Sequence, residues 1–92
     1  MCTYSTEAIV CPRSSGKGVA GWFPLEAASV YYDHPVHAPD DHTVNLDFLN
    51  ASLGSNSRVA LELSLEAARD LLAALQTIVL RATEHDIDDR RE

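Results

Sequence analysis

A proline-stiffened, histidine-rich segment between two β-forming runs constrains the fold of this chain more than any other feature. The segment Asp33–His42 reads DHPVHAPDDH and holds three of the four histidines. A residue before proline is pushed into extended backbone, so Pro35 and Pro39 disfavour a helix here. The preceding run Leu25–His34 is rich in β-forming residues, and Thr43–Leu49 alternates between apolar and polar residues. The sequence therefore predicts a β-hairpin with this segment as its loop.

The alternation also predicts the register of the hairpin. Pairing His34 with His42 places mostly apolar residues on one face of the sheet and mostly polar residues on the other. A slip by one residue would mix the two sets, so the pattern favours this register. The two imidazoles would then face each other at the rim of the apolar face. The apolar pairs are Tyr32–Val44, Val30–Leu46 and Ala28–Phe48, and the polar pairs are Asp33–Thr43, Tyr31–Asn45 and Ser29–Asp47.

Three further segments complete the predicted fold. Thr3–Val10 and Arg58–Leu63 alternate and predict strands, whereas the Gly/Ser-rich Arg13–Gly21 predicts a flexible connector. Apolar residues recur at helical spacing from Leu65 to about Thr83, which predicts a helix with Ser64 as its N-cap. We expect an α+β fold, a four-stranded antiparallel sheet with one C-terminal helix on one face. Residues 1–84 would form a single domain, and residues 85–92 a charged, disordered tail.

The loop histidines are candidate metal ligands, together with a cysteine from the first strand. If Val10 pairs with Glu26, the antiparallel first strand brings Cys2 to the loop end of the sheet. Imidazoles and a thiolate suit zinc or another divalent transition metal, and four such ligands complete a tetrahedral site. Because the spacing matches no standard zinc motif, the alternative is a solvated loop whose histidines make hydrogen bonds. The predicted ligands are His34, His37, His42 and Cys2.

The polar face of the predicted sheet carries a second candidate site. Paired carboxylates act as acid and base when their surroundings separate their pKa values. Asp47 or Glu62 would be the base, and Tyr31 a platform or acid for a small-molecule ligand. This pattern predicts an enzyme of the isomerase or cyclase type, or a ligand-binding module. Alternation alone also produces a wet sheet face or a polar dimer surface, so both interpretations stay open.

The charge and length of the chain limit the kinds of partner that it can bind and indicate where in the cell it acts. Fourteen acidic and seven basic residues give a net charge of −7, which disfavours nucleic acid and anionic membrane surfaces as partners. The sequence has neither a membrane-spanning apolar run nor a signal pattern, so we expect a cytoplasmic protein. A chain of 92 residues buries a modest share of its surface. We therefore expect a homodimer, formed through the aromatic residues around Trp22 or through the polar face.

One combination of motifs resembles a known family. The chain opens with Met-Cys-Thr-Tyr, continues through Gly-Lys-Gly and Gly-Trp-Phe-Pro, and reads Val-Tyr-Tyr-Asp-His-Pro-Val-His-Ala-Pro over residues 30–39. Together these segments are similar to a family of small bacterial proteins of unknown function, and the similarity spans most of residues 1–82. The resemblance implies a free-standing, single-domain bacterial protein and assigns no chemistry to any residue.

Overall fold

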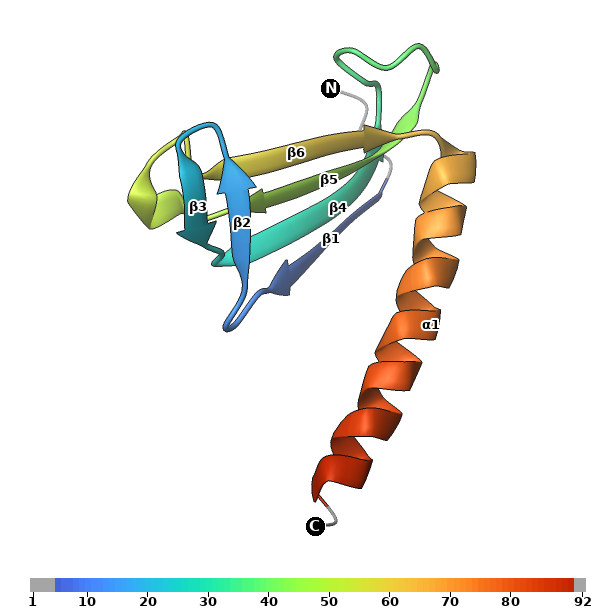
Figure 1. Ribbon diagram of the computed structural model, residues 1–92. Coiled ribbons are helices and arrows are strands. Elements are labelled where there is room, and N and C mark those ends of the chain that lie inside the picture. Colours follow the sequence, from blue (N-terminus) through green and yellow to red (C-terminus); the bar gives the residue numbers. More distant parts are fainter. Residues whose placement is uncertain (1–4, 91–92) are drawn as a thin grey trace.

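A four-stranded antiparallel sheet forms the centre of the computed structural model, which describes residues 5–90, with side chains through residue 85. Its strand order is β1-β4-β5-β6 (Figure 1). A two-stranded hairpin, β2-β3, lies at one end of the sheet, and the helix α1 leaves from the other end (Figure 1). The predicted α+β fold, with a four-stranded antiparallel sheet and one C-terminal helix, is therefore confirmed. The sheet strands are β1 (Ser5–Val10), β4 (Ala27–Asp33), β5 (Thr43–Leu49) and β6 (Arg58–Leu63).

The central hairpin has the predicted register. β4 and β5 pair with Tyr31 opposite Asn45, so the apolar and polar residues separate onto the two faces as expected. β6 extends this order, because it places Glu62 opposite Asn45 and Leu61 opposite Leu46. The polar face therefore brings together side chains from three neighbouring strands, and burial of the apolar side chains explains why a one-residue slip is disfavoured.

The first strand pairs in a different register from the one predicted. β1 lies antiparallel to β4 with Val10 opposite Ala27 rather than Glu26, so the prediction was wrong by one residue. This shift by one residue moves the β1 side chains that were predicted on the apolar face of the sheet to the polar face, and the others to the apolar face. The backbone N–H of Cys11 donates to the carbonyl oxygen of Glu26 at 3.0 Å, which fixes the register beside the turn. All six residues of this edge strand are exposed, so burial selects neither face and alternation could not predict the pairing.

The segment predicted as a flexible connector is instead a hairpin. β2 (Ser15–Gly18) and β3 (Gly21–Pro24) pair antiparallel, and Phe23 is buried. A Cβ at Gly18 would lie 3.1 Å from the carbonyl oxygen of Asn56 and 3.2 Å from the ring of Phe23, so a larger residue here would crowd the connection between β5 and β6. Two four-residue strands with three glycines carry no alternating apolar pattern, which is why the sequence did not predict them.

The C-terminal helix begins as predicted and ends later. α1 (Leu65–Arg90) follows β6 after the single residue Ser64, whose Oγ accepts a hydrogen bond from the N–H of Ala67 at 3.1 Å. The helix continues to Arg90 rather than ending near Thr83, while the division into residues 1–84 and a tail stays a prediction. A short 3₁₀ helix, η1 (Ala51–Leu53), lies between β5 and β6. No helix in the described part of the chain has an apolar stretch long enough to cross a bilayer.

Candidate functional site

The loop between β4 and β5 folds back over the polar face and is held there by one carboxylate. The N–H groups of His37 and Ala38 donate to Oε1 of Glu62 at 2.9 and 3.0 Å, and the N–H of Val36 donates to Oε2. These hydrogen bonds, led by the one from Val36, lower the pKa of Glu62 below its ordinary value of 4.5. Glu62 is therefore an ionised anchor for the loop.

A buried polar cluster lies where this loop meets the sheet. Thr43 is completely buried, and Asn45 and Asp33 are 4% and 7% exposed. The hydroxyl of Thr43 donates to Oδ1 of Asn45 at 2.8 Å, and the N–H of His34 donates to Oδ1 of Asp33 at 2.7 Å. Every buried side-chain nitrogen or oxygen among the described residues has a hydrogen-bond partner. This end of the polar face is thus covered and satisfied, unlike the wet surface that alternation alone would give.

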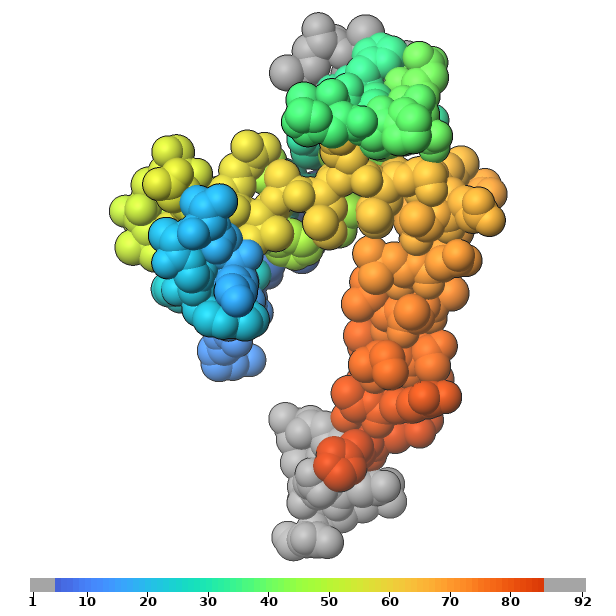
Figure 2. Space-filling view, turned by 45° about the horizontal axis from the view of Figure 1, so that its top comes forward, coloured from blue at the N-terminus to red at the C-terminus, as the bar shows by residue number. Residues whose placement is uncertain are grey.

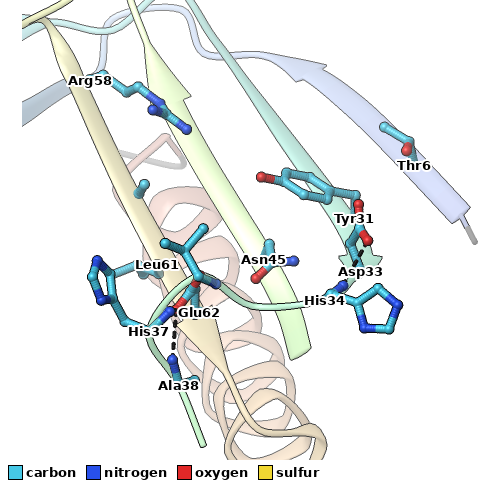
Figure 3. Close-up of a pocket in the computed structure, with 12 residues that line it drawn as sticks. Thr6, Tyr31, Asp33, His34, His37, Ala38, Asn45, Arg58, Leu61 and Glu62 are labelled. Atoms are coloured by element: carbon cyan, nitrogen blue, oxygen red, sulfur yellow. Dashed lines mark hydrogen bonds between the residues drawn. The ribbon is translucent and has the colours of Figure 1, made fainter. Parts of the chain in front are cut away.

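Between the loop and the sheet, the polar face is hollowed into an open groove of about 1180 Å³ (Figure 3). The ring of Tyr31 lies along the groove, with its hydroxyl directed toward the side from which Arg58 extends (Figure 3). The groove is large enough to take a small organic molecule, and both aliphatic and polar side chains line it. Its lining residues are Thr6, Tyr31, Asp33, His34, Val36, His37, Ala38, Asn45, Arg58, Ala60, Leu61 and Glu62.

The second predicted carboxylate on this face is also engaged by its own chain. Nε and Nη2 of Arg58 donate to the two oxygens of Asp47 at 2.5 and 2.7 Å, a bidentate ion pair. The hydrogen bond that Arg58 donates to Asp47 is the main cause that raises the pKa of Arg58. The Asp47 side chain is only 13% exposed, whereas that of Arg58 is 53% exposed. Asp47 and Glu62 therefore both position other groups of the protein.

Two of the predicted histidines face each other at the loop end of the sheet. The ring centroids of His34 and His42 lie 4.3 Å apart with a 34° tilt, and the ring of Tyr32 stacks on His42 from below the loop. Asp41 orients both imidazoles: its carbonyl oxygen lies 3.0 Å from Nδ1 of His34, and its Oδ2 lies 3.0 Å from Nδ1 of His42. Both oxygens only accept, so the neutral tautomer that makes these two contacts carries its proton on Nδ1 of each ring.

The structure brings together some of the predicted ligands and separates others. His34, Asp41 and His42 offer one ligand atom each, all within 4.8 Å of one another. His37 is not part of this group, because its backbone is tied to Glu62 and its ring lies on the other side of the loop from His34 (Figure 3). Cys2, the fourth predicted ligand, lies outside the described residues.

Two functional features were missed by reasoning from the sequence. The pair of Arg58 with Asp47 requires the register of β5 with β6, which alternation on the two strands would have supplied. The contact of Glu62 with three loop amides joins residues about 25 positions apart and depends on the path of the loop, for which no sequence pattern exists.

Comparisons with known proteins give one match. No curated protein and no solved structure matches the chain. A family model does match, and it covers residues 1–88, which confirms the predicted resemblance to a family of unknown function. The chain therefore belongs to DUF6295, a family of unknown function.

Proposed function

We propose that the protein binds a divalent transition metal, zinc first, through Nε2 of His34 and Nε2 of His42. The observation that carries this proposal is the role of Asp41, which holds the Nδ1–H of both rings with its carbonyl and its carboxylate. Metal-binding histidines commonly donate their other ring N–H to a carbonyl or carboxylate, which fixes the tautomer and the ring orientation.

Two imidazoles leave coordination positions for other donors. His34 also lines the groove, so a molecule in the groove could reach a metal held at this pair. Such an open arrangement suits a Lewis acid more than a closed structural centre. Cys2 remains a candidate further ligand. His37 would join only if the loop amides were released from Glu62.

Elemental analysis of untagged protein after exposure to zinc tests this proposal. We expect stoichiometric zinc in the wild type, loss of zinc in His42→Ala, and retention in His37→Ala, which is the matched control from the same loop. Asp41→Asn should weaken zinc binding about 10- to 100-fold, because it removes the carboxylate that orients His42. Failure of the wild type to bind zinc, copper or nickel, or equal loss in the two alanine variants, would refute it. Cys2→Ser decides the role of the thiol.

The groove supports a second candidate function, a ligand-binding module. The concave groove on the polar face distinguishes this function from a flat wet surface, and Tyr31 supplies a flat ring within it. The lowered pKa of Glu62 makes it a weaker base, and Asp47 is paired with Arg58. These contacts favour binding over isomerase or cyclase chemistry that uses either carboxylate as the base.

A screen of small ring compounds by protein NMR tests the groove. Ligands should shift the signals of Tyr31 and Ala60, and Tyr31→Ala should abolish the effect, because the ring offers the stacking surface. Tyr32→Ala is the matched control, since Tyr32 lies on the opposite face of the same strand. A library that shifts no groove residue, or that binds Tyr31→Ala unchanged, would contradict this function.

We also propose that the protein acts in the cytoplasm as a homodimer. The buried thiol of Cys11 is free, which suits a reducing compartment. The dimer is supported by the small apolar core: among the described residues only Cys11, Phe23 and Ala28 are buried hydrophobic residues.

A further inference from the structure

Many large apolar side chains are exposed in the described part of the chain, and half of those residues lie on one helix. Between Leu65 and Leu80, each large aliphatic residue of α1 is from 36% to 61% exposed. Those side chains, except Leu80, fall within one broad stripe along the helix, because they recur at three- and four-residue spacing. An apolar stripe of this kind ordinarily faces a core. The residues are Leu65, Leu71, Leu72, Leu75, Ile78, Val79 and Leu80.

The sheet of the same chain does not cover this stripe. α1 contacts mainly β5 and β6, and Ala68, near its start, is half-buried. From Leu72 onward the large aliphatic residues are more than half exposed. The 26 residues of α1 span about 39 Å at 1.5 Å per residue. Only Ser64 separates α1 from β6, so no linker allows the helix to fold back across the sheet.

The apolar face of the sheet is the second uncovered surface. Ile9 in β1 and Leu61 in β6 lie on this face and are 56% and 42% exposed. The β2-β3 hairpin covers only one end, where Gly16 approaches Val59. Figure 2 shows open space between this hairpin and α1, which stands away from it. The chain thus carries two apolar surfaces, one on a helix and one on a sheet, that face no partner within it.

The amount of exposed surface matches what a stable dimer needs. The chain exposes 7083 Å², whereas a compact monomer of 10.1 kDa exposes about 5300 Å². Its radius of gyration is 15.6 Å, against about 12 Å for a compact domain of this length. The excess of about 1800 Å² per chain exceeds the roughly 800 Å² that each partner buries in a standard interface. It lies within the range of obligate homodimers.

A second copy of this chain is the partner that these surfaces fit. Each copy carries both the apolar helix and the apolar sheet face, so a two-fold axis lets both pairs of surfaces cover each other at once. A net charge of −7 argues against an anionic membrane as the covering surface.

We propose that two copies pair about a two-fold axis, with α1 of each copy lying across the partner's apolar sheet face near Ile9 and beside the partner's α1. This inference rests on the proposed homodimer and names its surface, which is neither the aromatic residues around Trp22 nor the polar face. The groove stays on the outer side of each sheet, open to solvent.

Light scattering on the full-length chain, with substitutions on the two sides of α1, tests this arrangement. The wild type should have twice the chain mass of 10.1 kDa. Val79→Glu places a charge in the apolar stripe and should raise the dimer dissociation constant about 30-fold or more. Thr77→Glu is the matched control, because it adds the same side chain on the opposite side of the helix. It should leave the dimer intact, as should Trp22→Ala.

Isotope-filtered NMR on wild-type protein mixed from labelled and unlabelled chains gives a test that needs no variant. We expect intermolecular NOEs between the methyl groups of Ile9 and those of α1, Val79 among them. A wild type of single-chain mass would refute the homodimer and this arrangement together. A dimer without these NOEs, one that withstands Val79→Glu, or one that Trp22→Ala dissociates would refute the arrangement alone and leave the homodimer standing.

Discussion

The two faces of the sheet differ in how completely they are covered within one chain. On the polar face, the loop from β4 to β5 covers Asp33, Thr43 and Asn45, and the buried polar atoms described there all have hydrogen-bond partners. On the apolar face, Ile9 and Leu61 are largely exposed, and the stripe of α1 faces no part of the sheet beyond its first turns. The only described residue with no exposed surface is therefore polar, Thr43, whereas many of the large apolar side chains are exposed.

This difference arises because hydrogen bonding and apolar burial depend on different properties of the chain. Hydrogen bonds are local and directional, so a nine-residue loop with well-placed donors can complete a polar surface by itself. Apolar burial scales with area, and a chain of 92 residues with a projecting helix lacks the area to cover both its helix and its sheet. The groove belongs to the face that one chain completes, so the groove forms in each copy independently of the partner.

The largest effect should come from the buried polar pair. Asn45→Leu removes the acceptor of the Thr43 hydroxyl, which is completely buried. We expect unfolding free energy to fall by about 1–3 kcal/mol, the usual cost of a buried polar group without a partner. Urea unfolding at matched protein concentration measures this loss. The double variant Thr43→Val with Asn45→Leu should recover much of it, since both polar groups are then absent. A single variant as stable as the wild type would show that the polar face does not depend on this pair.

A smaller, local effect should follow from loosening the loop anchor. Glu62→Gln keeps the shape of the side chain but removes the charge that accepts three backbone N–H groups. Hydrogen exchange of the Val36, His37 and Ala38 amides should accelerate about tenfold, because charge-assisted hydrogen bonds are the stronger kind. Glu26→Gln, an exposed glutamate of the same chain, is the control and should leave these amides unchanged. Equal exchange in all three proteins would mean that the loop is held by other contacts.

Acid should release the same anchor. The pKa of Glu62 is lowered by the loop amides, so the folded state favours the ionised form. The stabilisation is present above the ordinary value of 4.5 and is lost as pH falls through the lower folded-state pKa. NMR signals of the Val36–Ala38 amides should therefore change below pH 4.5 in the wild type and not in Glu62→Gln. A transition that persists in Glu62→Gln would assign it to another carboxylate.

The sequence predicted the strands in which apolar and polar residues alternate and missed the features that depend on distant contacts. Thr43–Leu49 and Arg58–Leu63 are strands with the predicted bounds, and the pairing of β4 with β5 is the predicted one, because it sorts apolar and polar residues onto opposite faces. The register of β1 was predicted wrongly because all residues of this strand are exposed. The β2-β3 hairpin was not predicted, because its packing depends on a close backbone approach at Gly18, and such a contact leaves no periodic pattern in the sequence.

The predictions about the candidate site also agree with the structure only where they followed from strand pairing. The facing pair of His34 with His42 followed from the strand register and is present. His37 was predicted as a ligand on the assumption that neighbouring loop residues converge on one point. The contact of the loop with Glu62 instead holds the ring of His37 on the other side of the loop from His34 (Figure 3). That contact joins the loop to a strand outside the hairpin, so local spacing held no information about it.

The smallest effect should come from the charged pair on the same polar face. Arg58→Ala removes the bidentate partner of Asp47, yet the Arg58 side chain is 53% exposed, so water replaces much of the lost contact. We expect a loss of about 1 kcal/mol or less, as for other exposed ion pairs, and less in high salt. A double-mutant cycle with Asp47→Asn in urea measures the coupling. If this coupling exceeded the cost of Asn45→Leu, the stability of the polar face would come from charge rather than from the buried neutral pair beneath the loop. Arg58 also lines the groove, so an unchanged fold in Arg58→Ala would leave the variant available for measuring its part in ligand binding.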